Sequence, residues 1–309
     1  MTILRSHSIL SAHMDNIEAV DMNDILVGKT AKVNEPQSII RKTKEKRLHD
    51  EQTEEEGCRK ILEALTPEEI EDMSDENLLI RHYRADKGNI PKAIKRIKYA
   101  IQWRKDMKVK EMLKAAHNPE TEEEHKIRNI LMHEAETGKM FVRGYDKEER
   151  AILWIYQKRE NSNNPEHNIM HLVYQIERLL ACTEKMGYEK AVIVLDFDGW
   201  RMKHASSLDI TKKTIHILQD CYVERLARVY FSNAPGIFRT FYSMVKGFID
   251  PNTRNKIKFL TDEEEKAKYF DPETAESCIF GQSNLREYNV EDYFSVPLNV
   301  SFDENAANL

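Results

Sequence analysis

The sequence predicts an α/β protein in which a helical N-terminal lobe precedes a layer of alternating strands and helices. Up to about residue 117, apolar residues recur at helical spacing only. From about residue 130 onward, short apolar or β-branched runs alternate with helical stretches, which favours a mixed, mostly parallel sheet with right-handed crossovers. With 309 residues, the chain is long enough for one large domain or two modest ones.

Residues 1–54 mix polar residues with charges of both signs and show no sustained apolar period. We expect them to form a largely disordered tail. The tail contains a VGKT run, Val27–Thr30, but Asn23 stands where a phosphate-binding loop needs glycine. The run therefore does not predict a nucleotide site.

Residues 55–117 are expected to form a small helical subdomain. Thr66 and Pro67 are typical of a helix start, and Ser74 is a second candidate cap. Two apolar stripes follow, one on each side of the Gly88-Asn89 break: Leu78, Leu79, Ile80 and Tyr83, then Ile90, Ala93, Ile94, Ile97, Ile101 and Trp103.

A basic stretch lies in this subdomain. Between Lys92 and Lys114 there are nine Lys or Arg residues and two acids, an excess of 9 − 2 = +7. Two interpretations stay open: an ordinary solvated helix face, or a surface that meets anionic lipid headgroups.

An acidic run at Glu120–Glu124 is expected to break the helical part. The α/β lobe then covers residues 130–295, and residues 296–309 form a C-terminal tail. Strands are predicted at Ala151–Tyr156, Ala191–Phe197, Ala227–Ser232 and Lys256–Leu260, separated by helical stretches.

Composition excludes several classes of protein. The charge of 47 − 53 = −6 gives no global field that would attract nucleic acid. The four cysteines are widely separated and form no C-x-x-C pair, so we expect neither disulfides, a metal site nor a cofactor. No stretch approaches the roughly 20 apolar residues of a membrane span, and the N-terminus lacks the apolar core of a signal peptide.

The sequence lacks three common catalytic motifs. There is no G-x-G-x-x-G after a strand, no G-x-S-x-G and no H-E-x-x-H. Asp196 and Asp198 end a predicted strand, where they could form a metal site or a turn whose carboxylates bind loop amides. We expect that the protein is not an enzyme.

The segment Gly236–Ile249 follows a helix breaker and carries a wide apolar face. Its members recur at three- and four-residue spacing: Ile237, Phe238, Phe241, Val245, Phe248 and Ile249. Such a face can pack into a core or line an apolar cavity, and composition does not separate these two cases.

Four segments resemble the CRAL-TRIO lipid-binding family, in its phosphatidylinositol/phosphatidylcholine transfer branch. The run from Cys221 to Leu260 looks like the family signature, Leu78–Arg104 resembles its N-terminal helical subdomain, and Gly144–Ile155 resembles one of its strands. AVIVLDFDG resembles the strand that floors the family's pocket. The resemblance covers about residues 55–295.

The resemblance implies an α/β lobe that encloses one lipid beneath a mobile gate helix, here Gly236–Ile249. It also implies a set of residues that hold the lipid headgroup: Arg84, Glu224, Arg225, Thr253 and Lys256. Cations and hydroxyls would offset the desolvation of a phosphodiester, and a carboxylate can accept from inositol hydroxyls. Val223 departs from the family's proline, and Ala191 and Ile193 replace the hydroxyl residues of its phosphatidylcholine site.

The expected function is therefore that of a cytoplasmic, monomeric carrier with transient peripheral association with membranes. It would bind phosphatidylinositol, or a phosphorylated form, and exchange it between membranes or present it to lipid kinases. Two alternatives stay open: a lipid-sensing scaffold without transfer, and a carrier of a retinoid- or tocopherol-like molecule, which would not need Glu224 and Lys256 for a headgroup.

Overall fold

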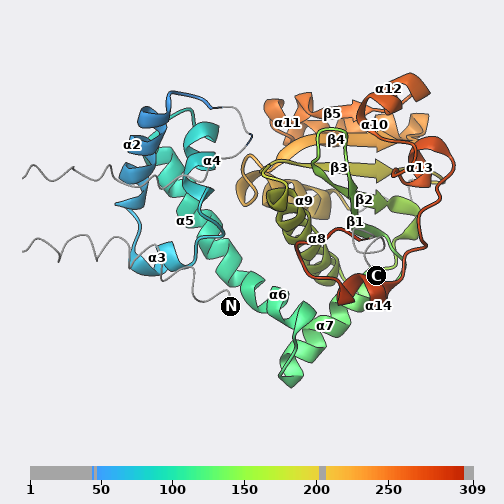
Figure 1. The fold of residues 1–309 in the computed structure, drawn as a ribbon, viewed down its shortest axis with the longest axis horizontal. Helices are drawn as coiled ribbons and strands as arrows, with labels where there is room; N and C mark the ends of the chain where they lie inside the picture. The colour runs from blue at the N-terminus through green and yellow to red at the C-terminus, as the bar shows by residue number, and fades with distance from the viewer. Residues whose placement is uncertain (1–43, 45–46, 202–206, 303–309) are drawn as a thin grey trace, which may run out of the picture.

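The computed structural model describes residue 44, residues 47–201 and residues 207–302. These residues form a helical lobe and an α/β lobe that lie side by side and are joined below by two helices (Figure 1). Most of the predicted tail, including Val27–Thr30, lies outside the described residues. Its predicted end at residue 54 is wrong, because Asp50 caps a helix that begins at Glu51 and its side chain accepts from the amide of Thr53.

The helical lobe packs around its own apolar core. Thr66 and Glu69 form the capping box that starts the second helix, as predicted, whereas Asn77, not Ser74, precedes the third. Both predicted stripes contribute to the core, which includes Ile61, Leu78, Leu79, Ile80, Tyr83, Ala93, Ile97 and Ile101. The helices are α2 (Glu51–Leu62), α3 (Pro67–Glu71), α4 (Leu78–Ala85) and α5 (Ile90–Asp106).

Gly57 allows α2 and α4 to approach closely. A Cβ atom at this position would overlap the ring of Tyr83, which is itself buried in the lobe. The contact therefore requires the absence of a side chain at residue 57.

The basic stretch is largely neutralised. Seven of its nine cations pair with carboxylates, among them Arg104 with Glu177 at 2.5 Å and Lys98 with Glu69 at 2.7 Å. The surface is therefore not a bare positive face, which favours the interpretation as an ordinary helix face over a lipid-binding surface.

The helical part does not end at the acidic run. Thr121 and Glu124 form a capping box, so the acids lie in the first turn of a helix, where the helix dipole favours negative charge. The two joining helices are α6 (Val109–His117) and α7 (Glu122–Ala135). Helical structure thus continues beyond the predicted boundary at residue 117.

The α/β lobe contains a five-stranded sheet in the order β1-β2-β3-β4-β5. The pairs from β2 to β5 are parallel, and β1 pairs antiparallel with β2, with Phe141 opposite Trp154. The predicted strands are confirmed within one or two residues, and β1 is the strand that the apolar runs did not predict. The strands are β1 (Met140–Tyr145), β2 (Ala151–Tyr156), β3 (Ala191–Asp196), β4 (Leu226–Ser232) and β5 (Ile257–Phe259).

Helices cover both faces of the sheet (Figure 1). The longest, α8 (Pro165–Lys185), begins with Asn164 as cap and proline at its first position. The other helices of this lobe are α9 (Leu208–Asp220), α10 (Gly236–Val245), α11 (Pro251–Asn255), α12 (Glu263–Tyr269), α13 (Ser277–Phe280) and α14 (Val290–Ser295), with 3₁₀ turns η2 (Gln157–Arg159) and η4 (Lys246–Phe248).

In the described ranges no helix is long and apolar enough to cross a membrane.

The predicted C-terminal tail packs onto the sheet as far as it is described. Ser301 and Phe302 are buried, the amide of Phe302 donates to the carbonyl of Val142 at 3.2 Å, and the hydroxyl of Ser301 accepts from the amide of Gly144 at 2.7 Å. Residues 303–309 lie outside the described part of the chain. The boundary at residue 296 is therefore wrong, because β1 offers free edge groups that this segment satisfies.

Candidate functional site

A cavity of about 580 Å³ lies against one face of the sheet, between α8, α9 and the segment around α11. Its size is typical of a site that encloses a small molecule. Most of the wall is aliphatic. The apolar lining comes from α8, α9 and the strands, and includes Ile169, Leu172, Ile176, Leu179, Ile193, Leu195, Ile215, Leu218, Val229 and Ile257.

The periods of the elements explain this wall. Along β3, Ala191, Ile193 and Leu195 line the cavity, whereas Val192 and Val194 face the main core. Along α8, the lining residues recur every three or four positions, so that one stripe of the helix faces the cavity. Ala191 and Ile193 give the floor of the cavity an apolar surface.

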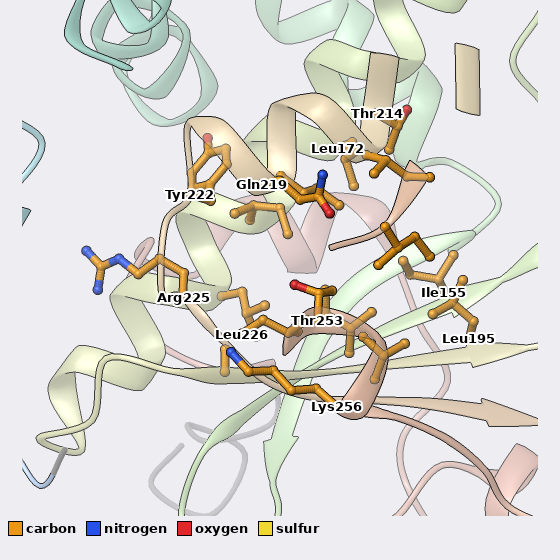
Figure 2. Close-up of a pocket in the computed structure, with 18 of the residues that line it drawn as sticks. Ile155, Leu172, Leu195, Thr214, Gln219, Tyr222, Arg225, Leu226, Thr253 and Lys256 are labelled. Atoms are coloured by element: carbon orange, nitrogen blue, oxygen red, sulfur yellow. The ribbon is translucent and has the colours of Figure 1, made fainter. Parts of the chain in front are cut away.

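One end of the cavity is polar. Glu224, Thr253 and Lys256 line this end, and Figure 2 shows the side chains of Thr253 and Lys256 close to each other, with Ile155 and Leu195 toward the opposite side. The Lys256 Nζ atom lies 3.8 Å from the Glu224 Oε2 atom, which is too long for a hydrogen bond. Asp250 caps α11, and its side chain accepts a hydrogen bond from the amide of Thr253 at 3.0 Å.

Burial and neighbouring charges set the protonation of this end. Burial lowers the pKa of Lys256 below its ordinary value; the charge of Glu224 opposes this effect and that of Lys190 adds to it. Burial also disfavours the ionised form of Glu224, but the hydrogen bond from Lys190 and the charges of both lysines outweigh it, so the pKa of Glu224 is lowered. The polar end therefore holds a carboxylate and a partly desolvated ammonium.

Arg225 lies beside the cavity, but its guanidinium points away from the other labelled side chains (Figure 2). It pairs with Asp75 of the helical lobe and with Glu184 of α8, both at 2.8 Å. Arg81 holds the same Asp75 at 2.6 Å. The structure thus gives Arg225 a bracing role between the two lobes, while its contact with a headgroup stays a prediction.

This network predicts acid sensitivity. Burial disfavours ionisation of Asp75, but Arg81 and Arg225 outweigh it and hold the pKa of that carboxyl well below its ordinary value of 3.8. A depressed folded-state pKa stabilises the fold fully above about pH 4, and the stabilisation is lost as pH falls through the folded-state value. We expect the stability difference between wild type and Asp75→Asn, measured by urea unfolding, to shrink below about pH 4. A difference that stays constant there would contradict the depressed pKa.

Arg84 does not line the cavity. Its guanidinium donates to both carboxylate oxygens of Glu54, at 2.9 Å and 2.6 Å, and Glu54 is buried in α2. The neighbouring Ala85 does reach the cavity wall. Arg84 is thus already paired with a buried acid inside the helical lobe, and its headgroup role stays a prediction.

The expected gate segment is helical, but α10 ends at Val245 and a 3₁₀ turn follows. Of the six residues on the predicted apolar face, only Ile249 lines the cavity. Phe238 is buried with Phe241 partly buried against it, and Val245 is also buried, whereas Ile237 and Phe248 are 53% and 43% exposed.

The buried side of α10 forms an aromatic cluster next to the cavity. Phe238 packs 3.8 Å from Phe197 and 5.2 Å from Phe231, measured between ring centroids, and Phe231 also lines the cavity. The helix α10 therefore covers the sheet next to the cavity and does not lie over the cavity itself. At Phe238, the predicted apolar face packs into a core.

Sequence reasoning missed Lys190, whose Nζ atom lies 2.8 Å from the Glu224 Oε2 atom. It also missed Gln219, which lines the cavity and accepts from the amide of Asp250 at 2.7 Å. Neither residue stands in a motif, since each owes its position to a contact between distant segments.

The two strand-end acids do not form a metal site. Asp196 accepts from the side chain of Asn233 at 2.8 Å and from the amide of Asp198 at 3.2 Å, which is the turn arrangement considered above. Across the residues that the structure describes, no group of three or more His, Cys, Asp or Glu side chains could hold a metal ion.

Comparison with known proteins places these features in context. A family model described as the CRAL/TRIO domain matches residues 135–279. In fold, the chain is similar to the crystal structure of Sfh5, with a TM-score of 0.58 and 20% sequence identity, covering 84% of this chain and 96% of that one. The predicted fold class, a helical lobe followed by a mixed α/β lobe, is confirmed.

Proteins with similar sequences are known from two yeasts. The chain is 31% identical over 216 residues to CRAL-TRIO domain-containing protein C23B6.04c of Schizosaccharomyces pombe, a match to 70% of this chain and 20% of that protein. It is 27% identical over 185 residues to phosphatidylinositol transfer protein PDR17 of Saccharomyces cerevisiae, covering 58% and 51%. The Sec14 cytosolic factor of Schizosaccharomyces pombe is 28% identical over 194 residues, covering 60% and 66%. The matches thus span about a fifth, a half and two thirds of these relatives.

Proposed function

Because the chain belongs to the CRAL-TRIO family, in its Sec14-like branch, we propose that it encloses one phospholipid, phosphatidylinositol or a phosphorylated form of it. It then exchanges this lipid between membranes or presents it to lipid kinases, acting as a monomer in the cytoplasm. It acts as a carrier and catalyses no reaction.

The observation that carries the proposal is the half-buried Lys256 ammonium at one polar end of a cavity whose wall is mostly aliphatic. A buried cation is costly unless an anion meets it, and a phosphodiester is an anion that arrives attached to acyl chains. Thr253 adds a hydroxyl and Glu224 an acceptor for the hydroxyls of an inositol ring. The aliphatic wall receives the acyl chains.

The exposed side of α10 and η4 supports transient membrane contact. Ile237, Met244 and Phe248 are exposed there, and the Lys212 Nζ atom lies 4.7 Å from the centroid of the Phe248 ring. Apolar side chains beside a cation suit a membrane interface with anionic lipids. In the proposed cycle this helix moves at the membrane, opens the cavity and closes again in water.

Native mass spectrometry of the purified protein, followed by identification of the extracted lipid, tests the proposal. We expect close to one phosphatidylinositol per chain. A sterol, a retinoid or another neutral ligand would instead support the small-molecule carrier and remove the headgroup roles of Glu224 and Lys256. A chain that takes up no lipid from liposomes would favour the scaffold.

Filling the cavity should prevent uptake. Ile193 lies on the cavity side of β3, so Ile193→Trp places a large ring where the acyl chains would lie. We expect co-purified lipid to fall well below one molecule per chain, as measured by the same mass spectrometry. Ile193→Val is the matched control and should keep its lipid. Full occupancy in the Trp variant, folded by circular dichroism, would place the lipid elsewhere.

A further inference from the structure

Two lysines share one carboxylate oxygen at the polar end of the cavity. The Glu224 Oε2 atom lies 2.8 Å from the Lys190 Nζ atom and 3.8 Å from the Lys256 Nζ atom. Lys190 thus makes the hydrogen-bonded pair, and Lys256 stands about an ångström too far away to make a second one. The two cations are not equivalent toward the acid.

The backbone fixes this unequal arrangement. Glu224 has a φ of +55°, in the left-handed region, so its side chain leaves the turn before β4 in a defined direction. The amide of Ala191 donates to the carbonyl of Arg225 at 3.0 Å, which ties the residue after Lys190 to the residue after Glu224. Arg225 is in turn held by Asp75. The backbone around Lys190 and Glu224 therefore sets the positions of these two side chains.

We infer that Lys190 is a positioning residue for the anionic group of the ligand: it holds the carboxylate of Glu224 and leaves Lys256 available to the phosphate. The inference rests on the proposed function, since it concerns the same polar end. Lys190 is not among the residues that line the cavity, so it acts through Glu224.

Removing Lys190 should redirect Glu224. The nearest remaining cation in this group is Lys256, and a shift of about 1 Å would turn their present 3.8 Å ion pair into a hydrogen-bonded one. A phosphate would then have to displace Glu224 from Lys256 before it could bind. Asp250 and Arg228 also act on Lys256, but Asp250 is engaged as the cap of α11 and Arg228 donates to the carbonyl of Ala227.

The first experiment is a double-mutant cycle with phosphatidylinositol in phosphatidylcholine vesicles as the probe. We expect Lys190→Ala to weaken equilibrium binding by about tenfold, on the scale of a charge-assisted hydrogen bond. In a Glu224→Gln background the same change should have little effect, because no carboxylate remains to capture Lys256. Lys190→Arg should restore binding. An equal loss in both backgrounds would mean that Lys190 touches the ligand itself, and no loss in either would overturn the inference.

A second measurement needs no ligand. In NMR spectra of protein labelled at lysine, with Lys256 assigned from Lys256→Arg, the pKa of Lys256 should rise in Lys190→Ala, because a like charge is gone and Glu224 becomes its partner. An unchanged pKa would overturn the inference even if the chain binds no phosphatidylinositol. Failure of the proposed function would appear separately, as a wild-type chain that binds no such lipid while the pKa still rises.

Discussion

Lys256→Ala is expected to lower the affinity for phosphatidylinositol by about 10- to 100-fold, the loss of one buried hydrogen bond to a charged group. The side chain is half-buried at the polar end of the cavity, and no carboxylate lies within hydrogen-bonding distance of its Nζ atom in the described residues. Its charge is therefore available to a phosphate. Transfer of fluorescent phosphatidylinositol between vesicles, with binding at equilibrium, measures the effect.

Lys258→Ala is the matched control. Lys258 lies on β5, two residues after Lys256, donates to the hydroxyl of Tyr269 at 2.5 Å and does not line the cavity. The control variant removes the same charge from a neighbouring position, so we expect transfer close to that of wild type. If the Lys256 variant, folded by circular dichroism, moved phosphatidylinositol as fast as wild type, the phosphate would lie elsewhere in the cavity.

Arg225→Met is expected to destabilise the fold by about 3 kcal/mol, within the range for breaking a buried ion pair from one side. Two carboxylates face the guanidinium, Asp75 from the helical lobe and Glu184 from α8. Methionine retains much of the side-chain volume and removes the charge, so these acids lose a partner in a buried place. Urea unfolding measures the free-energy difference, and the loosened lobe contact should also weaken lipid binding.

Arg228→Met controls for the loss of an arginine from β4. Arg228 is only partly buried, and its guanidinium donates to a carbonyl of its own strand, that of Ala227. We expect its stability to stay within about 1 kcal/mol of wild type. The bracing role would be wrong if Arg225→Met unfolded at the urea concentration of wild type while losing its lipid, since that result is typical of a ligand contact.

Much of the fold follows from patterns inside single elements. Thr66 with Pro67 predicted a helix start, which the structure closes with a capping box, and the apolar run at residues 191–197 predicted the central strand β3. The sequence alone did not reveal β1, whose Arg143 and Gly144 interrupt the apolar run of the strand. Nor did it reveal that the acids at residues 120–124 begin a helix, because a run of like charges is also typical of a loop.

The site was predictable where its residues follow one motif. Glu224, Thr253 and Lys256 line one end of the cavity, while their role toward a headgroup stays a prediction. Arg84 and Arg225 carry the same charge as Lys256 and could not be told apart from it by residue type. Their partners, Glu54 and Asp75, lie 30 and 150 residues away along the chain.

The sequence by itself determined the class of the fold, the order of its lobes and most element boundaries, because helix and strand periods and caps depend on residues a few positions apart. Only the tertiary structure decided which of the predicted headgroup residues line the cavity, which side of α10 is buried and where Lys190 points. Those outcomes depend on electrostatic and packing partners that folding brings together from distant parts of the chain, and a local pattern holds no record of them.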